Sequence, residues 1–280
     1  MGHGSHWESV TGSAEDAIKE WIPTVIQKGT MVGESTFLFD DGEYPPRLEK
    51  CFGIVYPGDS MRFLALISTN SLSDPKSNFL FSAFPFPHDG PVNSIEIDSV
   101  EDWCNPIEGI VEGTTKGGAS VSFFDPFYFL NKSRYRNGDS ADFIITALAY
   151  RLQPCEQQEI QIDGGPLLEE ERKRVLEQNP DADVTEIKSV SVSLEEACWL
   201  MSTDVKDDFE FRGIPESVEP LKVGGVKFYK VTMVLIRPDD IDFRVAVYAS
   251  EAILGGFVPR VGQSIEGFLW LQGRLAALDQ

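Results

Sequence analysis

The densest group of residues that could bind a ligand lies in residues 123–135, Phe-Phe-Asp-Pro-Phe-Tyr-Phe-Leu-Asn-Lys-Ser-Arg-Tyr. Asp125, Tyr128 and Tyr135 carry polar groups that could orient a ligand against the apolar surface of the phenylalanines, as in most small-ligand sites. The alternative is a strand and loop whose aromatic side chains fill the core. Full burial with internally bonded polar groups would favour the core. A binding site requires the Asp125 carboxyl group or a tyrosine hydroxyl to open into a pocket.

A second group of candidates lies on the last strand that the sequence predicts. If Leu269 and Leu271 face the core, the alternation of a strand places Trp270, Gln272 and Arg274 together on the opposite face. Tryptophan and arginine are typical anchors of binding interfaces. The face is therefore either an open binding surface or a surface that the N-terminal part of the chain covers.

Searches for catalytic and cofactor motifs find none. The sequence has no phosphate-binding loop of the Gly-x-x-x-x-Gly-Lys-Ser/Thr type, no nucleophile elbow and no His-Glu-x-x-His motif. We therefore expect no cofactor and no metal, and we assign no catalytic residue. The adjacent carboxylates Asp40 and Asp41, and Asp239 and Asp240, could serve a carboxylate-dependent hydrolase, which is kept as an alternative function.

Cysteine and histidine usage suggests no reactive centre. Cys51, Cys104, Cys155 and Cys198 lie far apart without a Cys-x-x-Cys pair, so we expect four reduced thiols. The two histidines of residues 1–7 lie in a tag-like start and are poor metal candidates. The third histidine, in the sequence Phe-Pro-His-Asp-Gly, is expected in an exposed turn.

The charge of the chain limits its partners. The net charge is −21, of which residues 1–203 carry −18 and residues 204–280 carry −3. Because nucleic-acid binding depends mainly on Lys and Arg at phosphates, we do not expect a nucleic-acid partner for the acidic part. No apolar run approaches the ~20 residues of a membrane span. No secretory signal is recognisable, so we expect a cytoplasmic protein whose partner is an unknown protein or small molecule.

The pattern of short apolar runs broken by Gly, Pro and Asp predicts a mostly β protein with a few helices, of the α+β class, built from antiparallel strands. We divide the chain into a β-rich part with an N-terminal helix (1–155), a helical connector or insertion (156–205) and a second β-rich part (206–280). Capping and apolar spacing predict helices over residues 13–25, 99–104, 167–178 and 193–201.

Residues 206–280 show three successive strand patterns, a short helical turn and a closing pair of strands, an order that resembles the OB fold. This resemblance implies an OB-like barrel. A short phrase, Gly-(Asp/Gln)-Ser followed by apolar residues, begins at Gly58, Gly138 and Gly262, and it predicts three turns that each precede a strand. We expect a non-catalytic interaction or ligand-binding protein. An OB-like module that binds single-stranded nucleic acid is a further alternative.

Overall fold

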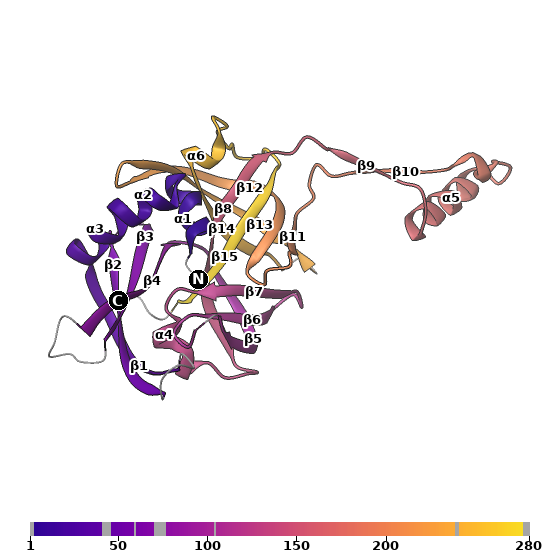
Figure 1. Ribbon diagram of the computed structural model, residues 1–280. Helices are drawn as coiled ribbons and strands as arrows, with labels where there is room; N and C mark the ends of the chain where they lie inside the picture. The colour runs from indigo at the N-terminus through magenta and orange to yellow at the C-terminus, as the bar shows by residue number, and fades with distance from the viewer. Residues whose placement is uncertain are drawn as a thin grey trace.

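A computed structural model describes residues 3–40, 46–58, 60–69, 77–103, 105–238 and 241–276 of the chain (Figure 1). Strands account for 54% and helices for 19%, which confirms the predicted class of mostly β structure with a few helices. Four residues singled out from the sequence lie outside the described residues, namely Asp41, Cys104, Asp239 and Asp240.

The strands form two large sheets and one small ribbon. The first sheet is antiparallel and contains, in this order, β1 (Thr30–Phe39), β2 (Arg47–Tyr56), β3 (Met61–Thr69) and β4 (Asn78–Pro87). The second sheet contains β5 (Val92–Asp102), β6 (Gly109–Thr115), β7 (Ser120–Asp125), β8 (Ser140–Pro154), β11 (Trp199–Ser202), β12 (Asp208–Val223), β13 (Val226–Ile236), β14 (Phe243–Ser250) and β15 (Ile265–Leu275). The ribbon pairs β9 (Glu159–Ile162) with β10 (Val190–Ser193).

The helices are short, and most of them lie at the N-terminus or between strands. They are α1 (Gly4–Thr11), α2 (Ala14–Asp16), the π-helical segment η1 (Ala17–Trp21), α3 (Ile22–Lys28), α4 (Tyr128–Asn131), the 3-10 turns η3 (Lys132–Arg134) and η4 (Val184–Glu186), α5 (Pro166–Gln178) and α6 (Glu251–Leu254). The predicted N-terminal helix is therefore present over residues 14–28, and a further helix precedes it.

The pairings of the second sheet close two rings of five strands that share β8 and β15. One ring runs β12–β13–β14–β8–β15 and returns to β12. The other runs β5–β6–β7–β15–β8 and returns to β5. In each ring one pairing is parallel, β14 with β8 and β7 with β15, and the others are antiparallel. The long strands β8 and β15 therefore join two small barrels back to back.

The two rings repeat one connectivity, and the predicted Gly-(Asp/Gln)-Ser phrase marks the repeat. The first half of the sheet has the order β5–β6–β7–α4–β8, and the second has β12–β13–β14–α6–β15. The amide of Gly138 donates to the Ile97 carbonyl at 2.7 Å, and the amide of Gly262 donates to the Pro215 carbonyl at 3.0 Å. A bulge follows directly after Ile97 in β5 and after Pro215 in β12. In both halves, therefore, the amide of the turn glycine donates to the carbonyl of the residue directly before a β-bulge.

The pairing of β8 with β15 places an approximate two-fold axis between the halves. Gly138 and Gly262 are separated by 124 positions, as are Ala147 and Leu271. Ala147 pairs with Leu271 in the antiparallel ladder, and the register is symmetric for two residues on each side, until a bulge between Phe268 and Leu269 shifts it. Each strand therefore pairs with its own counterpart, as a two-fold axis through that residue pair requires.

The third copy of the phrase has a different setting. Gly58 does precede a strand, β3, so all three predicted turns before strands are confirmed. Gly138 and Gly262 have φ of +85° and +78°, a conformation that favours glycine. Gly58 is not among the glycines with positive φ and leads into the first sheet. The structural repeat therefore comprises the second and third copies.

Residues 206–280 do not carry a closed barrel of their own. They supply β12 to β15, but the fifth strand of that ring is β8, from residues 140–154. The parallel partner that β14 needs thus lies before the predicted boundary at residue 156. A meander of sequential strands is readable from local patterns, whereas this long-range pairing is not.

The part of the predicted connector that carries β9, β10 and α5 is an arm that extends away from the barrels (Figure 1), whereas β11 belongs to the second sheet. The predicted helix over 167–178 is confirmed as α5. The predicted helix over 193–201 is wrong, because this stretch is a turn followed by β11, which pairs with β12. The predicted helix over 99–104 is also wrong, because β5 continues to Asp102 in its ladder with β6. Tertiary pairing outweighed the local capping pattern at both places.

Two apolar cores lie on the two faces of β15. The predicted inward residues Phe243, Val245, Val247, Ile265, Leu269 and Leu271 are all fully buried in the first core, which contains side chains from both rings. The second core contains Trp270 and joins the outer face of the barrels to the first sheet and the N-terminal helices. The helix α1 contacts β4, β8 and β14, so it lies between the first sheet and the barrels.

Candidate functional site

The carboxyl group of Asp125 organises the predicted aromatic segment from within. Asp125 ends β7 and is 1% exposed. Its oxygens accept hydrogen bonds from the Phe127 amide at 2.8 Å, from Asn131 Nδ2 at 3.0 Å and from the Tyr135 hydroxyl. Burial raises the pKa of Asp125 to about 6, although these hydrogen bonds and the charge of Arg274 act in the opposite direction. The carboxyl group therefore closes the loop that carries α4.

The two tyrosines of this segment are also bonded internally. Tyr128 is 1% exposed, and its hydroxyl donates to Asp102 at 2.7 Å. Burial, followed by the charge of Asp125 and the hydrogen bond to it, raises the pKa of Tyr135 well above its usual value. These contacts are the ones that the core interpretation requires for Asp125, Tyr128 and Tyr135. Phe127, in contrast, is only half-buried.

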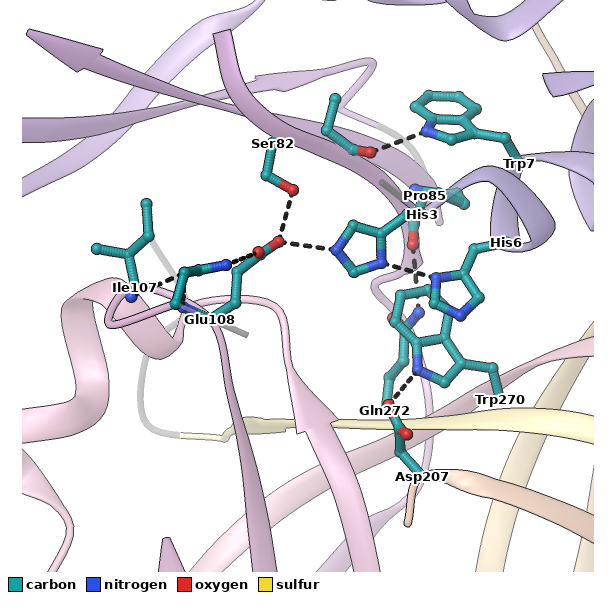
Figure 2. A network of polar contacts seen from close by, with 12 residues as sticks. His3, His6, Trp7, Ser82, Pro85, Ile107, Glu108, Asp207, Trp270 and Gln272 are labelled. Atoms are coloured by element: carbon teal, nitrogen blue, oxygen red, sulfur yellow. Dashed lines mark hydrogen bonds and ion pairs between the residues drawn. The ribbon is translucent and has the colours of Figure 1, made fainter. Parts of the chain in front are cut away.

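The predicted outer face of β15 is covered by the N-terminal segment (Figure 2). Trp270 is fully buried, and its indole N–H donates to Asp207 at 2.7 Å. The ring of His6 is stacked on the Trp270 ring, with centroids 3.6 Å apart and planes 8° apart. Gln272 is also fully buried and donates to the Pro85 carbonyl at 3.2 Å. Trp270 and Gln272 therefore contact other parts of the chain and not solvent.

His3 and His6 of the tag-like start belong to the core, contrary to the sequence-based expectation. His3 is 3% exposed and joins two partners, His6 through Nδ1 at 2.7 Å and Glu108 through Nε2 at 2.8 Å (Figure 2). Glu108 also accepts from Ser82 at 2.6 Å and from Asn105. The histidines are buried because the aromatic side chains around them complete the second core, which the local sequence does not indicate.

The electrostatics of this network favour one protonation pattern. Burial, followed by the neighbouring His3, lowers the pKa of His6 to about 2, so the His6 ring is neutral. Burial acts to raise the pKa of Glu108, but the hydrogen bond and charge of His3, together with Ser82 and Asn105, hold it below its usual value. The described residues contain no group of three or more His, Cys, Asp or Glu that could hold a metal ion. Through His3 and Glu108, the network links the N-terminal segment to Ser82 in β4.

A pocket lies where α4, the end of β15 and the first sheet meet. Its volume is about 60 Å³. The lining residues come from β1, β3, the end of β4, the α4 region and β15, and they are Val32, Arg62, His88, Phe127, Leu130, Arg274 and Leu275. Four of these side chains are apolar, two are guanidinium groups and one is an imidazole. The combination is that of a small-ligand site.

The strand geometry places the two guanidinium groups at this pocket. Arg274 follows Trp270 and Gln272 on the outer face of β15, and it is 5% exposed. Its Nε and Nη2 atoms donate to the His88 carbonyl at 3.2 and 3.1 Å. Arg62 comes from β3, and the amide of His88 donates to the Ser60 carbonyl at 2.6 Å, which ties the end of β4 to the start of β3.

The pocket brings together parts of both predicted groups of candidates. Phe127 and Leu130 belong to the aromatic segment, and Arg274 belongs to the last strand. Arg274 is thus the one predicted binding residue that lines the pocket. Arg62 stands in an ordinary strand pattern and was not predicted as a site residue. His88 is half-buried, whereas its local sequence predicts an exposed turn. No local motif identifies either residue, because only the fold brings them to β15.

Comparisons with known proteins do not assign the chain to a family. No family model and no curated protein matches the sequence. Among solved structures, the chain is similar to the cytoplasmic molybdate-binding protein ModG in a crystal form with molybdate bound, with a TM-score of 0.31 and 8% identity. The match covers 66% of this chain and 96% of that chain. A likeness at this TM-score identifies neither a shared fold nor a shared ligand.

Proposed function

We propose that this protein is a non-catalytic binding protein that holds a small anion in the pocket between α4, β15 and the first sheet. One observation carries the proposal: Arg62 and Arg274, separated by more than two hundred positions, meet at a cavity whose other walls are mainly apolar. Guanidinium groups bind carboxylates and phosphates through paired hydrogen bonds, and burial strengthens such contacts. The anion would be held by charge and positioned by the apolar wall.

The local charge at the pocket is opposite to the charge of the whole protein. Two arginines line the pocket of a chain with a net charge of −21. The charge of Arg274 also acts on the buried carboxyl group of Asp125, so it is shared between that group and the pocket. Arg62, from β3, adds a second positive charge to the lining. A concave site with this local charge favours a small anion over a cation or a nucleic acid.

Ligand-induced stabilisation tests the proposal. The melting temperature is measured with a panel of small organic and inorganic anions, at constant ionic strength and with chloride as the reference. A ligand at 100 times its Kd stabilises the folded state by about 2.7 kcal/mol, which corresponds to a rise of several degrees. The rise should disappear in Arg62→Gln and persist in Arg260→Gln, a control at an exposed arginine that does not line the pocket. If no anion raises the melting temperature above the chloride reference, the proposal is refuted.

The other functions considered from the sequence receive less support. A single-strand binder was expected to use the aromatic face of β15, but Trp270 on that face is fully buried. The described residues contain no helix that is long and apolar enough to cross a membrane. We also propose a reducing, cytoplasmic location, supported by the free cysteines Cys51, Cys155 and Cys198.

A further inference from the structure

We infer that the anion is a short-chain aliphatic monocarboxylate. The inference rests on the proposed function and names the class of ligand that the proposal leaves open. A cavity of about 60 Å³ has room for ~4–6 groups the size of a water molecule, because one such group needs roughly 10–15 Å³ of this volume. Acetate, propionate and butyrate have that number of non-hydrogen atoms, and inorganic tetrahedral anions do as well. Size therefore selects a very small ligand, and the lining decides its chemistry.

The lining favours a ligand with one charged end and one apolar end. The apolar side chains that line the pocket come from β1, the α4 region and β15, and they are Val32, Phe127, Leu130 and Leu275. A tetrahedral oxyanion carries charge on all sides, so some of its oxygens would face this apolar wall without a hydrogen-bond donor and at a large desolvation cost. A carboxylate places its charge at one end, towards Arg62 and Arg274, and its methylene groups against the wall.

The side chains of the apolar wall are packed against neighbouring elements, and this packing limits the length of ligand that the pocket can accept. Gly33 in β1 has φ of +154°, and a Cβ atom at this position would lie 2.9 Å from carbons of Leu130. β1 therefore lies in close contact with the Leu130 side chain. Phe127 is held by an edge contact with Phe86, with ring centroids 5.3 Å apart. Because close-packed walls do not yield easily, a ligand that is too long should be rejected.

Isothermal titration calorimetry with defined anions tests the inference. The probes are acetate, propionate, butyrate and hexanoate, with butyramide as the uncharged counterpart of butyrate, and sulfate and molybdate as tetrahedral anions. From acetate to propionate and from propionate to butyrate, each added methylene group should lower the Kd about fourfold. Hexanoate should bind at least tenfold more weakly than butyrate, and butyramide should show no measurable binding. Sulfate and molybdate should bind more weakly than butyrate.

Three variants and one control locate the binding. Arg274→Gln and Arg62→Gln should each weaken butyrate binding by at least tenfold, whereas Arg260→Gln should leave it unchanged. Because Arg274 also bonds to the His88 carbonyl, its replacement could disturb folding, so far-UV circular dichroism and the melting temperature are measured for each variant. Val32→Phe fills the apolar end and leaves both arginines in place, and it should abolish butyrate binding in a folded protein.

The outcomes separate the inference from the proposed function. Binding that tightens from acetate to butyrate and is lost in Arg62→Gln and Val32→Phe supports both. Tighter binding of sulfate or molybdate than of any carboxylate, with the same dependence on Arg62, overturns the monocarboxylate inference and leaves the anion site standing. Carboxylate affinities that do not depend on chain length also overturn the inference. Binding that is absent for every probe, or that survives Arg62→Gln and Val32→Phe, overturns both.

Discussion

Replacement of His6 by Asn should reduce the loss of stability on acidification. His6 is 9% exposed, and burial followed by the neighbouring His3 lowers its pKa to about 2 from the ordinary value of 6.5. The folded state therefore excludes a proton that the unfolded chain binds below pH 6.5. The stability that the neutral ring contributes is fully present above pH 6.5 and is lost as the pH falls towards 2. Asparagine cannot titrate, and its side-chain oxygen can occupy the place of the Nδ1 acceptor.

The expected magnitude follows from the two pKa values. Between pH 7 and pH 5 the unfolded histidine becomes almost fully protonated while the folded one stays neutral, which costs the wild-type protein about 2 kcal/mol. The variant lacks this loss. Its free energy of unfolding relative to the wild type should therefore rise by about 2 kcal/mol over the same interval, whatever the change costs at pH 7.

Urea unfolding of both proteins, followed by tryptophan fluorescence at pH 7, 6 and 5, measures this difference. The variant must be compared with the wild type at each pH, because buried carboxyl groups with a raised pKa stabilise the folded state as the pH falls, whereas His6 destabilises it. Burial raises the pKa of Asp125 to about 6, so the folded state gains stability from protonation as the pH falls through 6. This contribution is common to both proteins and cancels. A difference that stays constant within about 0.5 kcal/mol from pH 7 to pH 5 would mean that His6 is not a buried neutral ring.

Three further changes test the fold. Val245→Asp should unfold the protein, because a buried carboxylate without a partner costs several kcal/mol. An unchanged melting temperature would show that the Val245 side chain does not face the core. Gly262→Ala should lower the free energy of unfolding by about 1–2 kcal/mol because φ is +78° at this turn, and urea titration would measure it. Trp270→Phe should cost about 1–3 kcal/mol in the same assay, because it leaves the Asp207 carboxyl group buried without its indole partner. The denatured, unreduced protein should titrate four thiols, and two or fewer would refute the prediction of reduced cysteines.

The candidate site was partly predictable from the sequence. Alternation along the last strand predicted the face that carries Arg274, and the aromatic segment that supplies Phe127 and Leu130 was recognised as unusual. The two remained separate candidates, because nothing local indicates that α4 and the end of β15 are adjacent. The sequence predicted a binding role for the polar groups of Asp125, Tyr128 and Tyr135. In the structure these groups form internal hydrogen bonds that hold the loop together.

The sequence by itself determined the features that depend on neighbouring residues. The period-two pattern of β14 and β15 specified which side chains enter the core, because successive residues of a strand point to opposite faces. Glycine in the repeated phrase specified the turns before β8 and β15, because positive φ is accessible to glycine without strain. Both are properties of a few consecutive residues, and neither requires knowledge of a distant partner.

Tertiary structure alone decided which distant segments meet. β8 closes the ring of the C-terminal strands, and His3 and His6 enter the core beside Trp270, although their sequence resembles an appended tag. Arg62 reaches the pocket beside Arg274 by the packing of the first sheet against the barrels. The free energy of these contacts comes from long-range strand pairing and from apolar surface buried between elements. Such terms depend on the whole chain, and no local pattern encodes them.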